Sequence, residues 1–183
     1  RNRAPGLSRP TNTLRGPIGS TRTEPFRRHH LSRWVPGGGA WLSMEDFRGC
    51  ADPTGVVADG EEIALGFCGS YSGDSTALVG VTVHDPHVFV VGCWENPNDA
   101  QWRVPRAEVN AAVAAAMERY SVRQLACDPF GWRSEIEAWE AAYGEKIVVE
   151  WPTNSLPRIG PACDRFYQAV KEGAVTHDGD SRL

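Results

Sequence analysis

The fold of this chain is decided by one stretch, Ile63–Val83, which reads IALGFCGSYSGDSTALVGVTV. It holds a short apolar run, a turn-forming cluster of Gly, Ser and Asp, and a second run rich in β-branched residues. Two such runs joined by a glycine-rich connection predict a β-hairpin. A turn at residues 84–86 and a third apolar run over 87–94 extend it to three consecutive strands, which the short turns make antiparallel neighbours.

After the third strand, the spacing of apolar residues becomes helical over 105–120, 132–143 and 156–170, with strand-like runs at 122–127 and 146–151 between the helices. Strands that follow helices at these lengths are parallel crossovers. The predicted class is therefore α/β: a five-stranded mixed sheet, three antiparallel strands and then β-α units, flanked by helices. The first strand is central, with the fourth parallel beside it. That order is the ribonuclease H-like architecture.

Three regions are expected along the chain. Residues 1–24 combine Arg, Pro, Gly, Ser and Thr with few large apolar side chains, which predicts an irregular basic arm. Residues 25–60 contain more aromatic residues and are interpreted as a linker with a short helix near 44–50, and residues 61–183 as the folded body. Residues 1–34 carry eight arginines against one glutamate, although the whole chain has a net charge of −4. This asymmetry indicates either contact with a polyanion or a solvated tail.

The composition argues against several classes of protein. The five cysteines are scattered without a C-x-x-C pair, which disfavours a zinc cluster or a disulfide framework and fits a reducing compartment. No apolar run approaches the roughly 18 residues of a membrane span, and the Arg-rich N-terminus has no apolar signal core. The expected location is the cytoplasm, with no membrane partner.

Candidate functional residues lie at the ends of two strands. In an open sheet of this kind, sites form at the carboxyl ends of adjacent central strands, which here are Cys68 and Asp128. Asp128 could bind a hard divalent cation, or it could cap the helix that follows. Asp74, Asp178 and Asp180 are possible secondary acids, although turn formation alone would also explain them.

Several motifs resemble the C-terminal nuclease domain of tailed-phage large terminase subunits, especially those of phages and prophages of actinobacteria. They are Leu65–Val79, Ala126–Trp132 (ACDPFGW), Glu150–Asn154 (EWPTN) and Pro161–Tyr167 (PACDRFY). Phe26–Trp34 and Ala40–Leu42 are similar to the link from the motor to the nuclease, so residues 25–60 would be the end of the motor domain. The similarity covers about residues 24–183.

The resemblance implies a metal-dependent endonuclease (a hydrolase using Mg²⁺ or Mn²⁺) that cuts concatemeric phage DNA at the start and end of packaging in the bacterial cytoplasm. It also implies an ATPase motor ahead of this region and a ring oligomer for the intact protein. The implied partners are double-stranded DNA, the portal and the small terminase subunit. Asp128 matches a catalytic metal carboxylate of the family, and Cys68 stands where the family has an aspartate.

Two departures from the family pattern bear on activity. A thiol is a soft, mostly neutral ligand at pH 7, and it suits magnesium poorly. The third carboxylate is expected beyond Leu183, so the nuclease domain is expected to be incomplete at its C-terminus, and the motor is expected to lie outside the chain. One carboxylate cannot hold two metals. We therefore expect the chain as given to be inactive or impaired as a nuclease.

Other functions remain open. The loop at residues 69–74 between two strands could be the phosphate loop of an actin-like ATPase fragment, although that fold needs two such halves. A non-catalytic module that binds DNA or a packaging partner is favoured by the missing carboxylates. A resolvase or transposase would share the fold without the terminase motifs.

Arg27, Arg28 and Arg33 are the candidate DNA contacts in the basic region. If they bind phosphates, DNA affinity should fall steeply between about 50 and 200 mM salt, because each contact releases counterions. Fluorescence anisotropy with a labelled duplex measures this dependence. Binding that stays constant over the same range of salt would contradict the prediction.

Overall fold

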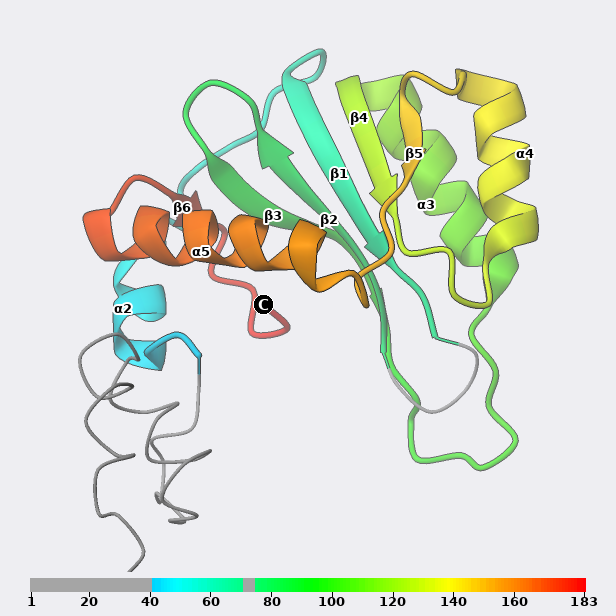
Figure 1. Ribbon diagram of the computed structural model, residues 1–183, viewed down its shortest axis with the longest axis horizontal. Helices are drawn as coiled ribbons and strands as arrows, with labels where there is room; N and C mark the ends of the chain where they lie inside the picture. Colours follow the sequence, from blue (N-terminus) through cyan, green and yellow to red (C-terminus); the bar gives the residue numbers. More distant parts are fainter. Residues whose placement is uncertain (1–40, 71–74) are drawn as a thin grey trace, which may run out of the picture. The chain divides into compact units, whose positions relative to one another are not determined.

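The computed structural model describes residues 41–70 and 75–183. Met44–Leu183 form one compact unit. Its elements, in order, are α2 (Met44–Gly49), β1 (Glu62–Cys68), β2 (Thr76–Thr82), β3 (His87–Trp94), α3 (Arg106–Arg119), β4 (Ser121–Cys127), α4 (Arg133–Tyr143), β5 (Val148–Glu150), α5 (Leu156–Glu172) and β6 (Thr176–His177). Figure 1 shows a sheet with helices on both faces, which confirms the predicted α/β class.

The strands form one mixed sheet in the order β5-β4-β1-β2-β3-β6. As predicted, β1, β2 and β3 are antiparallel neighbours, and β4 lies parallel beside a central β1. The sheet has six strands where five were expected, because β6 pairs in parallel with the start of β3. A two-residue strand has no periodicity of its own to be recognised, and only the return of the chain after α5 brings it to this edge.

The main core lies between the sheet and the layer formed by α3 and α4. Alternate residues of β1 (Ile63, Leu65 and Phe67) are at most 3% exposed and belong to the same buried cluster as Val109 of α3 and Ile136 of α4. Burying an apolar side chain of this size stabilises the folded state by about 1.5–3 kcal/mol. This layer therefore fixes the position of β1, and with it the strand ends at which a site can form.

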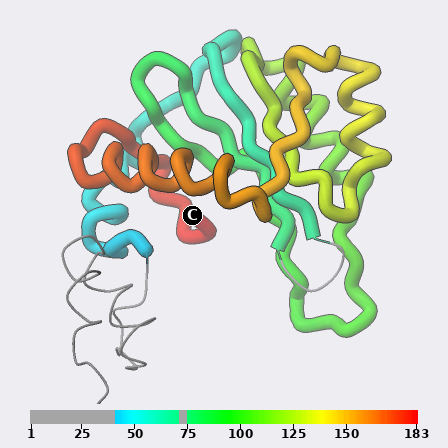
Figure 2. The backbone as a smooth tube through the Cα atoms, viewed as in Figure 1, coloured from blue at the N-terminus to red at the C-terminus, as the bar shows by residue number. Residues whose placement is uncertain are grey.

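The opposite face of the sheet is crossed by α5, whose path Figure 2 shows in orange and red. An open apolar groove of about 450 Å³ lies between them, lined by Gly66 and Val79 of the sheet and Phe166 of α5, among others. The helix ends at Gly173, whose φ of 65° is a left-handed conformation that glycine adopts without penalty. Within residues 41–70 and 75–183, no helix is both long and apolar enough to span a membrane.

The compact unit that begins at Met44 includes α2. His177 of β6 is one of the residues that hold this helix. Its ring stacks on Phe47 with centroids 4.2 Å apart, and its Nε2 lies 2.9 Å from the Phe47 carbonyl oxygen. Its Nδ1 accepts the Gly179 N–H at 3.1 Å, so Nε2 carries the proton and donates it. The sequence could not show this contact, because it joins segments 130 residues apart.

Replacing His177 with phenylalanine should keep the stacked ring and remove both hydrogen bonds. His177 is 5% exposed and Phe47 is half-buried, so the Phe47 carbonyl would lose its donor in a place partly shielded from water. We expect the free energy of unfolding to fall by about 1–3 kcal/mol, measured by urea denaturation. His84→Phe is the control, because the His84 side chain is 75% exposed. Equal stabilities for the two variants would contradict the prediction.

Candidate active site at the carboxyl ends of β1 and β4

The parallel pairing of β1 and β4 brings the two candidate residues together. Phe67 pairs with Cys127, and the Asp128 N–H donates to the Phe67 carbonyl at 3.0 Å. Cys68 follows Phe67 and Asp128 follows Cys127, so the two residues lie at the carboxyl ends of neighbouring strands, on the same side of the sheet. Cys68 is exposed to solvent. If Cys68 and Asp128 had lain at opposite edges of the sheet, they could not have formed one site.

The Asp128 carboxylate is held by three donors. Its Oδ1 accepts the Phe130 N–H at 3.1 Å, and its Oδ2 accepts the Thr153 N–H at 3.3 Å as well as the Thr153 hydroxyl. The alternative role as a helix cap is not observed, since α4 begins at Arg133 and Trp132 precedes it. The loop after β4 instead folds back on Asp128, so the orientation of the carboxylate is fixed.

Thr153 is a residue to which the sequence analysis gave no role, although it lies in the EWPTN motif. The Trp151 N–H donates to the Cys127 carbonyl at 2.7 Å and so continues the pairing of β4 with β5. The following turn is closed by the Ser155 N–H, which donates to the Pro152 carbonyl at 3.3 Å. The chain is thereby carried past Asp128 before α5 starts. The threonine could have been suspected from the motif, but its partner is visible only in three dimensions.

The Cys68 thiol is a poor anion in this setting. Partial desolvation raises its pKa, and the negative charge of Asp128 raises the pKa further. Each effect disfavours the thiolate, because one removes water from the charged form and the other adds a like charge beside it. Cys68 is therefore a neutral thiol at neutral pH, whereas an aspartate at this position would offer a charged oxygen.

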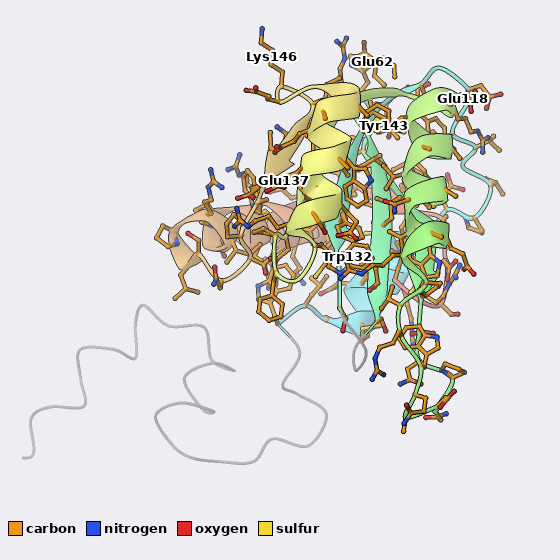
Figure 3. The ribbon with its side chains drawn as sticks, turned by 90° about the vertical axis from the view of Figure 1, so that its right-hand side faces the viewer. Glu62, Glu118, Trp132, Glu137, Tyr143 and Lys146 are labelled. Carbon is orange, nitrogen blue, oxygen red and sulfur yellow. The ribbon has the colours of Figure 1, made fainter. Side chains whose placement is uncertain are left out.

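The loops that follow β1 and β4 are tied together by Trp132. Its ring is fully buried, and its Nε1 donates to the Ser70 carbonyl at 3.0 Å. The Arg106 guanidinium lies over the ring at 4.4 Å and also donates to the Gly131 carbonyl at 2.7 Å. Figure 3 places Trp132 at the end of the helical layer opposite Glu62. The helical spacing over 132–143 includes Trp132, but it did not predict that the indole N–H joins the two loops.

The other predicted acids do not join Asp128 in the part of the chain that the structure describes. Asp178 accepts the Val90 N–H at 2.9 Å, halfway along β3, and the neighbouring β6 lies at the far side of the sheet from β4. Asp180 forms an ion pair with Arg182 at 2.5 Å, which lowers the pKa of Asp180 to about 2. Both are thus engaged in holding the C-terminal turn.

The remaining predicted residues lie outside the described ranges. They are Asp74 in the hairpin loop and Arg27, Arg28 and Arg33 in the basic region.

The residues at this edge do not fit a pair of magnesium ions. Two such ions need several oxygen ligands, and the described ends of β1 and β4 supply the Asp128 carboxylate beside the neutral Cys68 thiol. Within residues 41–70 and 75–183, no group of three or more His, Cys, Asp or Glu side chains could hold a metal. The two strand ends lie side by side as predicted, and a full set of metal ligands is not found in the described residues.

Comparison with known proteins relates this chain to phage proteins. It is 33% identical over 177 residues to the gene 13 protein of Mycobacterium phage D29 and 31% identical to that of Mycobacterium phage L5. Each match covers 86% of this chain and 30% of the relative, so the chain spans less than a third of their length. No family model matches. The crystal structure of the large terminase of bacteriophage HK97 matches 78% of this chain and 34% of its own, with a TM-score of 0.57 and 17% identity.

The chain has the fold of one part of a large terminase. The resemblance to large terminases that the motifs indicated is thus confirmed at the level of the fold. The terminase-like motifs ACDPFGW and EWPTN contain Asp128 and Thr153, which hydrogen-bond to one another. Two motifs that are separate in sequence therefore meet at one point of the site.

Adding a methyl group at Gly69 should disturb the contact between the two loops. A Cβ there would lie 2.2 Å from Trp132 Nε1, and the buried ring has no room to retreat. We expect Gly69→Ala to lower the free energy of unfolding by about 1–3 kcal/mol in urea denaturation. Gly49→Ala is the control, since its added Cβ would meet nothing within 4 Å. A Gly69→Ala protein as stable as this control would contradict the prediction.

Proposed function

We propose that this chain is part of the nuclease domain of a phage DNA-packaging large terminase, with its catalytic centre at Cys68 and Asp128. The observation that carries the proposal is the hydrogen bond from the Asp128 N–H to the Phe67 carbonyl, which sets the two strand ends side by side. The fold shared with the HK97 large terminase and the relationship to the mycobacteriophage proteins support it. Concatemeric DNA is the proposed substrate, with the portal and the small subunit as partners of the intact protein.

We further propose that cutting by this chain is impaired. A metal-dependent nuclease of this kind needs hard oxygen ligands for Mg²⁺ or Mn²⁺ at both strand ends. Asp128 is such a ligand, and its carboxylate is already oriented by Phe130 and Thr153. Cys68 is a soft, neutral ligand in the place where an aspartate would complete the pair.

The same thiol favours a second candidate function, a module that binds DNA without cutting it. A DNA mobility shift without cleavage products would support this alternative. The actin-like alternative gains no comparable support, because the described residues contain one sheet of this kind and that fold needs two.

The proposal is tested by restoring the oxygen ligand. The chain, its Cys68→Asp variant and the double variant Cys68→Asp/Asp128→Asn are incubated with supercoiled plasmid and Mn²⁺. We expect little or no nicking by the chain itself and at least a tenfold gain for Cys68→Asp, because a charged oxygen replaces a neutral thiol. The gain should disappear in the double variant.

Two results would count against the proposal in different ways. Robust Mn²⁺-dependent cleavage by the unchanged chain would refute the claim of impairment. Nicking by Cys68→Asp that persists after Asp128→Asn would remove Asp128 from the catalytic centre. Thermal unfolding of each variant controls for loss of structure.

A further inference from the structure

We propose that Arg133, Arg158 and Arg165 form a phosphate-binding surface, here named the basic edge, along which double-stranded DNA lies beside the Cys68–Asp128 site. The inference rests on the proposed function and names protein groups that would bind its substrate. These three residues belong to the described body of the protein, and they are distinct from the arginines of the N-terminal region.

The basic edge lies beside Asp128 because β5 lies beside β4. Cys127 pairs with Glu150, the last residue of β5, and two arginines converge on that glutamate. Arg133 Nη1 lies 3.0 Å from a carboxylate oxygen of Glu150, and Arg158 Nη1 donates to its main-chain carbonyl at 3.1 Å. Both guanidinium groups are thus within reach of one residue at the carboxyl end of the sheet.

Arg158 and Arg165 are held by uncharged partners. The Arg158 guanidinium lies 5.0 Å from the centre of the Trp151 ring, and Arg165 Nε donates to the Pro161 carbonyl at 3.3 Å. Neither contact neutralises a positive charge, and no ion pair joins either arginine to an acid of the described residues. Their side chains are exposed and partly ordered before any ligand arrives, which lowers the cost of binding a phosphate.

The spacing along α5 suits an extended polyanion. Arg158 and Arg165 are seven residues apart, which places them on one side of the helix about 10 Å from each other. Asp164 is next to Arg165 and projects about 100° further round the helix. Arg133, at the start of α4, remains 65% exposed despite its ion pair with Glu150. The three positive groups therefore outnumber the one acid that pairs with them.

The chain offers a closely matched control at the opposite end of the sheet. Arg123, in β4, forms an ion pair with Glu62, with side chains 61% and 32% exposed. The corresponding values for Arg133 and Glu150 are 65% and 36%. Figure 3 shows Glu62 far from Trp132, which marks the site end. Arg123→Ala therefore removes the same charge from the same kind of ion pair away from the proposed surface.

The test measures binding of the whole chain to a labelled DNA duplex by fluorescence anisotropy, in EDTA, over a series of salt concentrations. Arg133→Ala, Arg158→Ala and Arg165→Ala should each weaken binding about three- to tenfold at low salt, equally for two unrelated sequences. Each should also reduce the slope of log K against log salt by about 0.9, the value for one lost phosphate contact. Arg123→Ala should leave affinity and slope unchanged, and Arg158→Lys, which keeps the charge, should retain the slope.

The experiment distinguishes failure of the basic edge from failure of the proposed nuclease function. If the three variants bind like the unchanged chain, or if Arg123→Ala weakens binding as much as they do, the basic edge is refuted and the proposed nuclease function still stands. If the unchanged chain binds no duplex at any salt concentration, both proposals fail. DNA cleavage cannot affect this measurement, because the EDTA in the assay removes divalent metal ions. Should an alanine variant unfold, the Arg158→Lys measurement and the Arg165→Ala slope still decide the matter.

Discussion

The structure depends above all on the parallel pairing of β1 with β4. This pairing places Phe67 opposite Cys127 and lets the Asp128 N–H bond to the Phe67 carbonyl. A shift of one residue would turn each strand's buried side chains to the opposite face, so the core on the α3 and α4 side fixes this register firmly. The positions of Cys68 and Asp128 are therefore set by packing of the core, and they do not depend on the chemistry of the two side chains.

Geometry and chemistry are therefore separable at this site. The backbone that brings two strand ends together is intact, and Asp128 is oriented by Thr153 and Phe130. At the ends of β1 and β4, the side chain at position 68 departs from what a hard metal ion needs, and a thiol is small enough to replace a carboxylate at a solvent-exposed strand end without disturbing the core. This is why a single substitution can test for impaired cutting, while DNA binding by the basic edge can be examined independently.

The loops around the site are fixed by contacts between segments that are distant in sequence. Trp132, in the loop after β4, donates to Ser70 in the loop after β1. Thr153, in the loop after β5, donates to Asp128 in the loop after β4. The Trp132 ring is buried, so leaving its N–H without an acceptor would cost about 1–3 kcal/mol. The strand ends are consequently held by several weak interactions whose partners come from the β1–β2 hairpin and from the connections after β4 and β5.

The sequence by itself determined the order of the main elements, because β1, β2 and the helices carry clear periodicity, and the strand ends identified Cys68 and Asp128 as neighbours. It could not determine β6, whose two residues carry no period. Nor could it separate Asp178 and Asp180 from the site, because both are turn-forming acids until their partners Val90 and Arg182 are known. The tertiary structure decided which loops touch Asp128, since hydrogen bonds between distant loops depend on the path of each connection in space, which local sequence patterns do not contain.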